Sequence, residues 1–140
     1  MKKTMTMLLA VAVSSVASAH HSAAVFYKMD EEITLTGKVT EFRMGNPHLR
    51  IYFDLVNEAG ETEKWMAEGG SRTVLLRHNW TGNEIREGDV ITMTGNPSRD
   101  EDSNIVHVKD IILADGREMF AEDLNPDNAT RLLEERRRRD

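Results

Sequence analysis

The strongest constraint on the fold is a run of residues, His48 to Val56, in which polar and apolar side chains alternate strictly. The apolar set is Leu49, Ile51, Phe53 and Leu55, and the polar set is His48, Arg50, Tyr52 and Asp54. Successive side chains of a β-strand point to opposite faces, so this period of two predicts a strand with one buried face. Residues 31–42 alternate in the same way, and Gly37 interrupts their apolar face as glycine does at a bend or bulge.

The order of the expected elements favours one architecture. Further strands are expected at residues 62–68, 90–95 and 105–113, and a short helix capped by Ser71 at residues 71–79. Three strands, a helix and two strands is the order of an OB-type barrel. The predicted fold is therefore all-β: a small OB-like five-stranded barrel with one short helix between strands 3 and 4, plus a C-terminal helical tail. A small open sandwich would give a similar pattern, and the position of the helix favours the barrel.

The first 19 residues predict a secretory signal peptide. Lys2 and Lys3 precede a short apolar stretch, and Ala17-Ser18-Ala19 supplies the small residues that signal peptidase accepts. The apolar stretch is shorter than the ~20 residues that span a bilayer, so no stable membrane span is expected after cleavage. An uncleaved N-terminal anchor is the competing interpretation. We expect a bacterial periplasmic protein with residues 20–119 as a single β-barrel domain and 120–140 as a polar C-terminal tail or helix.

The composition removes several classes of function. There are no cysteines, which excludes disulfides, thiolate zinc sites, iron–sulfur clusters and thiol catalysis. The 18 basic against 24 acidic residues give a net charge of −6, which argues against nucleic acid as a partner. Cleavage after Ala19 would remove two lysines and leave 121 residues with a charge of −8. The five histidines are the main groups left for metal binding and proton transfer.

Cleavage after Ala19 would make His20 the first residue of the mature chain. An N-terminal histidine offers its free α-amine and its ring Nδ1 to the same metal, and one more imidazole completes a three-nitrogen histidine brace. This donor set suits Cu(II), which prefers tetragonal nitrogen and oxygen ligands. His48, directly after Asn46-Pro47 at a strand start, is the leading third ligand. His107 on the last strand is the second candidate, and His21 is an alternative donor beside the terminus.

The functional prediction is a periplasmic metal-binding protein that carries or sequesters copper, with a periplasmic protein partner or a copper donor or acceptor. The main alternative is an OB-like interaction module without metal, whose exposed face includes Arg50, Tyr52 and Trp80 and binds a partner protein or small ligand. A copper-dependent oxidoreductase is a third hypothesis. No residue pattern demands catalysis, since the carboxylates Glu41, Asp54 and Glu68 fit solvated strand faces.

Several motifs together resemble an uncharacterised family of small exported bacterial proteins. They are His20-His21-Ser22, Gly37–Phe42, Asn46-Pro47-His48, Trp65 with Glu68, Leu75-Leu76-Arg77 before Trp80, Gly88-Asp89 and Gly95-Asn96-Pro97. The resemblance covers roughly residues 20–119 and implies export and a compact barrel-like domain, without implying a reaction. The N-terminal histidine by itself resembles the copper sites of lytic polysaccharide monooxygenases and of periplasmic copper carriers. No polysaccharide-binding face accompanies it, so carriage or sequestration is favoured over oxygenase chemistry.

Overall fold

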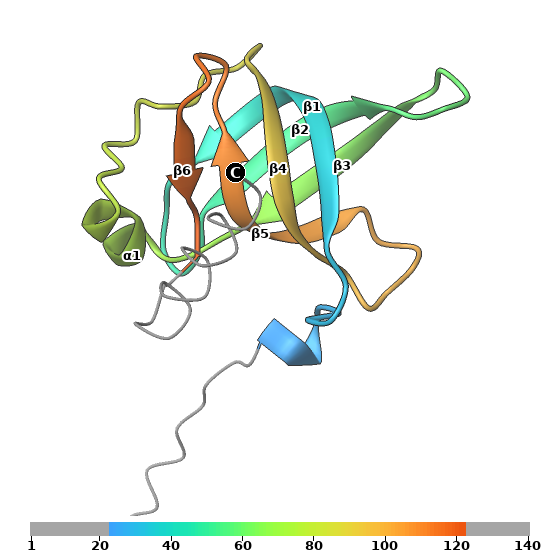
Figure 1. The fold of residues 1–140 in the computed structure, drawn as a ribbon, viewed down its shortest axis with the longest axis horizontal. Coiled ribbons are helices and arrows are strands. Elements are labelled where there is room, and N and C mark those ends of the chain that lie inside the picture. Colours follow the sequence, from blue (N-terminus) through green and yellow to red (C-terminus); the bar gives the residue numbers. More distant parts are fainter. Residues whose placement is uncertain (1–22, 123–140) are drawn as a thin grey trace, which may run out of the picture.

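A computed structural model describes residues 23–122 of the chain, and the expected signal peptide and C-terminal helix lie outside these residues. The described part is built almost entirely of strands (Figure 1). The elements in chain order are η1 (Ala23–Val25), β1 (Ile33–Arg43), β2 (Arg50–Val56), β3 (Thr62–Glu68), α1 (Arg72–Arg77), β4 (Val90–Pro97), β5 (Ile105–Ile112) and β6 (Glu118–Phe120).

Five of the strands close into a barrel. The hydrogen-bonded order is β3-β2-β1-β4-β5, and a further pairing between β3 and β5 completes the circle. The closing pair is parallel and the other pairs are antiparallel. Together with the helix between β3 and β4, this topology confirms the predicted OB-like barrel. The sixth strand, β6, lies outside the barrel against β5 and crosses the domain boundary expected after Met119.

The barrel interior is filled by the apolar side chains that the alternation placed on one face. In β2, Ile51 and Phe53 are buried while Arg50 is exposed, as predicted. Gly37 allows a close approach, because a Cβ added there would lie 2.4 Å from Cδ2 of Phe53. The rest of the interior follows the same rule, with Val39, Ala67, Ile91, Met93, Val106, Val108 and Ile111 at its centre.

Two β-bulges shift the alternation of buried and exposed side chains, at positions where the sequence periodicity predicts none. One lies between Val39 and Glu41 on β1, three residues beyond the position suggested by Gly37. The other lies in the β4–β5 pair, where Gly95 pairs with Val108 and Thr94 with Asp110. An extra residue in one strand reverses the facing of the residues after it. This is why Ile111 is buried on β5 and Ile112, which an uninterrupted alternation would place on the same face as Val106 and Val108, is 47% exposed.

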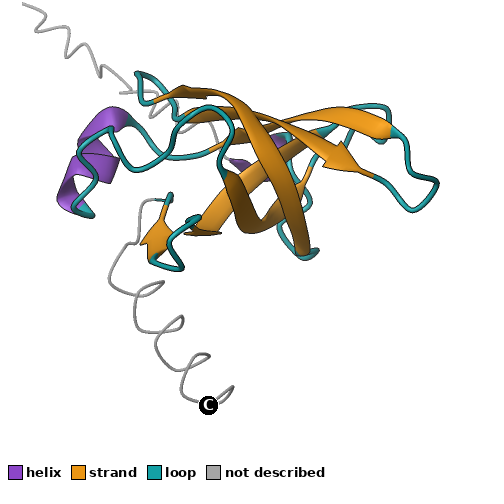
Figure 2. Ribbon diagram, turned by 90° about the horizontal axis from the view of Figure 1, so that it is seen from above, coloured by secondary structure: helices purple, strands orange, loops and turns teal. Residues whose placement is uncertain are grey.

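Helix α1 and the segment after it cover one end of the barrel, and the β2–β3 hairpin projects at the other (Figures 1 and 2). The predicted cap is confirmed, since the Ser71 hydroxyl accepts a hydrogen bond from the Val74 amide at 3.4 Å. Leu75 is buried, and Trp80 follows as one of the largest side chains in the core. The Trp80 indole Nε1 donates to the Phe120 carbonyl at 2.7 Å, which ties this end of the barrel to β6.

Candidate functional site

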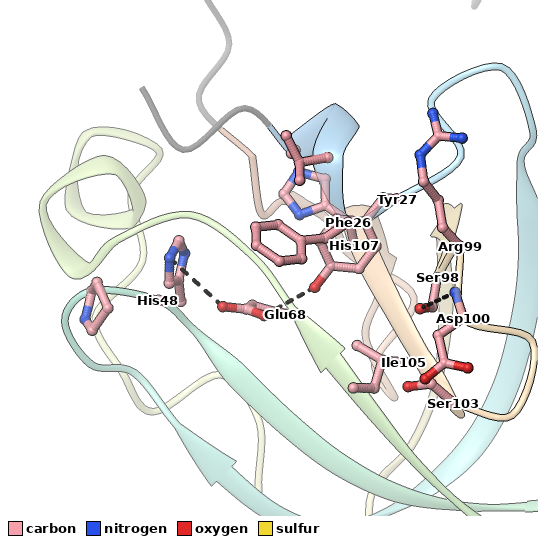
Figure 3. A pocket seen from close by; sticks show the side chains of 13 residues that line it. Phe26, Tyr27, His48, Glu68, Ser98, Arg99, Asp100, Ser103, Ile105 and His107 are labelled. Atoms are coloured by element: carbon pink, nitrogen blue, oxygen red, sulfur yellow. Dashed lines mark hydrogen bonds and ion pairs between the residues drawn. The ribbon is translucent and has the colours of Figure 1, made fainter. Parts of the chain in front are cut away.

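A pocket of about 790 Å³ lies on the outside of the barrel, between the N-terminal segment and the strands that close it (Figure 3). It is bordered by the β1–β2 connection and by the β4–β5 connection, which are the loops that OB folds use for binding. Its lining residues come from four places: Ala23–Tyr27, Pro47 with His48, Glu68, and a group from Ser98 to His107.

Glu68 stands at the centre of the pocket because of its place in the sheet. It is the last residue of β3, where Arg50 of β2 is its cross-strand partner on one side and His107 of β5 on the other. Its neighbour Ala67 is fully buried, so the alternation of the strand turns the Glu68 side chain outward. The Glu68 side chain is 20% exposed.

His48 reaches Glu68 from the loop before β2. Backbone hydrogen bonds between Leu49 and both Gly69 and Gly70 hold this loop against the end of β3. The ring Nδ1 of His48 lies 3.1 Å from the Gly69 carbonyl oxygen. A carbonyl oxygen only accepts hydrogen bonds, so Nδ1 carries the proton and Nε2 bears the lone pair in the neutral ring. That Nε2 lies 3.6 Å from Oε1 of Glu68, as the dashed line in Figure 3 shows.

Tyr27 fills the space between Glu68 and His107. Its hydroxyl donates to Oε2 of Glu68 at 2.9 Å, and its ring centroid lies 5.1 Å from that of His107. The side chain is held by the pairing of Tyr27 with Ser98 and is 8% exposed. Burial, then the hydrogen bond to Glu68 and its negative charge, raise the pKa of the Tyr27 phenol well above its usual range, against a smaller opposing effect from Arg50.

The free energy of unfolding should fall less between neutral and alkaline pH in Tyr27→Phe than in the wild type. The raised pKa means that the folded protein holds the phenol proton more tightly than the unfolded chain does. The stabilisation is therefore complete below the unfolded pKa of about 10 and is lost as the pH rises above it. Urea unfolding at about pH 8 and about pH 11 should show a larger drop for the wild type than for Tyr27→Phe. Tyr52→Phe, on the outer face of β2, is the matched control, and equal drops for wild type and Tyr27→Phe would contradict the assignment.

The structure brings two of the predicted metal ligands together. His48 and His107 line the same pocket, on either side of Glu68 and Tyr27. His107 also has its Nε2 3.7 Å from Oε1 of Glu122. His20 and His21 lie outside the described residues, which begin three residues after His20 at the wall of this pocket.

One of the three residues predicted on the exposed partner-binding face does not lie there. Arg50 is exposed and Tyr52 is half-buried on the outer face of β2. Trp80, expected on the same face, is 2% exposed and packs inside the barrel end, with its ring centroid 6.1 Å from that of Phe42. A tryptophan after a helix has no periodic pattern of its own, so sequence alone did not separate a rim position from a core position.

Glu68 and Tyr27 are site residues that the sequence analysis missed. Glu68 was interpreted as a carboxylate on a solvated strand face, and Tyr27 precedes the first expected strand. A usable signal existed for Glu68, because the hairpin at residues 58–60 fixes the register of β2 and β3. Counting back from the Val56–Thr62 pair reaches the Arg50–Glu68 pair, with His48 just beyond it. No comparable count leads to Tyr27.

Within residues 23–122, no three histidine or carboxylate side chains are grouped closely enough to bind a metal ion. Over the same range, no helix has the length and apolar character needed to cross a membrane.

Comparison with known proteins gives one family and a distant structural likeness. A family described as being of unknown function (DUF6152) matches residues 8–106. Among solved structures, Rim1, a mitochondrial single-stranded DNA binding protein from S. cerevisiae, matches at 15% sequence identity with a TM-score of 0.45. That match covers 59% of this chain and 93% of the other. No curated protein matches the sequence.

Proposed function

The chain belongs to DUF6152, a family of unknown function, and from its own residues we propose that it is an exported, periplasmic copper-binding protein that carries or sequesters the metal. The proposed ligands are the α-amine and ring of His20 at the mature terminus and the Nε2 of His48. His107, in the same pocket, is the alternative to His48.

The observation that carries the proposal is the orientation of the His48 ring. Histidines that bind metals almost always donate their other ring N–H to a carbonyl or carboxylate, which fixes the tautomer. His48 has this arrangement, with Nδ1 donating to the Gly69 carbonyl and Nε2 turned toward the Glu68 carboxylate. The Nε2 and the carboxylate oxygen, 3.6 Å apart, attract positive charge, either a proton on Nε2 or a bound metal cation, and the proposal requires the metal to replace that proton.

The length of the chain brings the proposed terminus within reach. Ala23 lines the pocket, and His20 is three residues before it. Each residue extends a chain by at most about 3.6 Å, so the two Cα atoms lie within about 11 Å of each other. Cleavage after Ala19 would therefore leave a free amine and an imidazole on a chain long enough to reach the pocket that His48 lines. Together with the His48 ring, these two nitrogens would complete the three-nitrogen set of the proposal.

The donor set also selects the metal. Three nitrogens with a carboxylate oxygen from Glu68 nearby suit Cu(II), which heads the affinity order of the divalent first-row metals. The chain has no cysteine, so no soft thiolate ligand competes with these nitrogen and oxygen donors. Binding should weaken on acidification, because protons compete with the metal for the amine and imidazole nitrogens.

Copper titration of the exported protein tests the proposal. Intact mass should first show that the chain begins at His20. Electron paramagnetic resonance should then show a nitrogen-rich Cu(II) spectrum, and His48→Ala should weaken binding by more than about 100-fold, the upper range for losing an outer-shell partner. His78→Ala is the matched control, because His78 caps α1 and does not line the pocket.

Three results would count against this assignment. A chain that begins at another residue excludes the histidine brace. An unchanged spectrum in His48→Ala together with a loss in His107→Ala transfers the third ligand to His107. No Cu(II) binding by a chain that does begin at His20 overturns the metal function itself.

A second candidate function, an interaction module without metal, is favoured by the outer face of β1 and β2. Arg43 and Arg50 are direct cross-strand partners, and like charges in such a pair are destabilising. Arg43 also lies over the Tyr52 ring, 5.6 Å from its centroid. The Arg43 guanidinium is already paired with the Glu41 carboxylate, so a partner protein or small ligand with an anionic group would pair chiefly with Arg50, and Arg50→Gln should weaken its binding.

A further inference from the structure

We propose that the pocket beside Glu68 also binds a small organic amine: a molecule with one protonated amino group and a flat apolar body. This goes beyond the copper proposal and rests on the pocket of the described residues alone. Three features carry it: an unfilled pair of hydrogen-bond acceptors, the charge of the lining, and an exposed aromatic wall.

The acceptor pair is the Nε2 of His48 and the Oε1 of Glu68, 3.6 Å apart. The Nδ1 of His48 is already engaged with the Gly69 carbonyl, and Oε2 of Glu68 accepts from Tyr27. Within residues 23–122 no hydrogen bond to Oε1 is made, and the 3.6 Å contact with His48 Nε2 is an ion pair only when that ring is protonated, so the amine site requires the neutral ring. A protonated amine has three N–H donors and no acceptor, so one ammonium can donate to both atoms at once.

The charge of the lining favours the same ligand. Two carboxylates, Glu68 and Asp100, face the pocket against one cationic residue, Arg99. The Nε of Arg99 donates to the Ala24 carbonyl at 2.9 Å, and Oδ1 of Asp100 accepts from the Asp102 amide. The cross-strand neighbour Arg50 offsets part of the charge of Glu68 from outside the pocket. An anionic ligand would have to approach Glu68, whereas an ammonium is attracted to it.

An apolar wall faces the carboxylate. Phe26 is 59% exposed and its neighbour Val25 is 67% exposed, although both line the pocket. Figure 3 shows the Phe26 ring beside those of Tyr27 and His107, with Glu68 below them. Covering exposed apolar surface is favourable, and ammonium groups bind at the faces of aromatic rings. The volume of about 790 Å³ falls within the range of small-molecule sites and is far larger than a single metal ion needs.

Amine and copper would compete for the Nε2 of His48, so the two proposals are tested under different conditions. The amine is titrated into the full exported protein after treatment with EDTA, whereas copper is added without amine. Copper binding without amine binding overturns only the amine site. Amine binding without copper binding overturns only the metal function.

The test compares three probes with one ring and different charges: benzylamine, benzyl alcohol and benzoate. Calorimetry should show saturable one-to-one binding of benzylamine, with the alcohol and benzoate each weaker by about tenfold or more, since only the ammonium donates charge-assisted hydrogen bonds to both acceptors. Glu68→Gln should lower the affinity for benzylamine to the affinity for benzyl alcohol. Phe26→Ala should lower the affinities for benzylamine and benzyl alcohol by similar factors.

Two control variants lie outside the pocket. Asp54→Asn removes a carboxylate from the outer face of β2, and Val56→Ala truncates a side chain that is 67% exposed. Both should leave the three affinities unchanged. Equal binding of benzylamine and benzyl alcohol by the wild type, or no saturable binding of benzylamine, overturns the proposal without reference to any variant. A folded Glu68→Gln protein that keeps the preference for the amine also overturns it.

Discussion

Gly95→Ala is expected to prevent the barrel from folding stably. A Cβ at this position would lie 2.1 Å from the His107 carbonyl oxygen and 2.8 Å from its carbonyl carbon, closer than real Cβ atoms come. Both atoms belong to the backbone of the neighbouring strand at the β4–β5 bulge, so no side chain can move aside. The loss should reach at least about 3 kcal/mol, the upper part of the usual range for overpacking. Urea unfolding followed by circular dichroism measures it.

Gly45→Ala is the matched control for that substitution. The nearest atom to a Cβ at Gly45 is the His48 carbonyl oxygen at 3.8 Å, which is an ordinary contact. Its free energy of unfolding should stay within about 0.5 kcal/mol of the wild type, as for substitutions without a specific mechanism. Equal stability of the two alanine variants would contradict the close approach of the β5 backbone to Gly95.

Trp80→Ala is expected to cost about 3–5 kcal/mol, the range for truncating a large aromatic side chain in a core. Trp80 is 2% exposed, stacks near Phe42 and donates to the Phe120 carbonyl. Trp80→Phe keeps most of the packing but removes the indole hydrogen bond to that carbonyl, which should cost about 0.5–1.5 kcal/mol. Thermal and urea unfolding measure both losses.

Leu76→Ala provides the comparison for Trp80, since Leu76 lies on α1 at the same end of the barrel but is 49% exposed. Its truncation should cost less than about 1 kcal/mol. If Trp80→Phe has the same free energy of unfolding as the wild type, the hydrogen bond from the indole to Phe120 of β6 contributes nothing to stability. If Trp80→Ala unfolds like Leu76→Ala, Trp80 is not part of the core.

The elements that were predictable from sequence are those determined by local interactions. The alternation around Ile51 and Phe53, the hairpin that follows, and the Ser71 cap each depend on residues close together in the chain, and each is found in the structure. The order of these elements was enough to predict the barrel. The facing of Ile112 was not predictable, because the bulge that reverses it arises from pairing with a different strand, β4.

The site was predictable only in part, for the same reason. His48 and His107 were identified by their chemistry, but their common pocket depends on the parallel pairing of β3 with β5. Tyr27 enters the site through contacts with residues more than 40 positions away, Glu68 and Ser98, which no periodic pattern encodes. Glu68 could have been found by counting the hairpin register, whereas Tyr27 could not.

The closing pair of the barrel also determines when its pocket comes into existence during folding. His48 and Glu68 are brought together by the β2–β3 hairpin, a local structure of the kind that forms within microseconds. Glu68 and His107 meet only when β3 pairs with β5, and contacts so distant in sequence form slowly because a long loop must close first. A ligand that contacts both Glu68 and His107 therefore binds only the closed barrel. Such a ligand would slow unfolding and raise the melting temperature, and above its dissociation constant the stabilisation grows with the logarithm of its concentration.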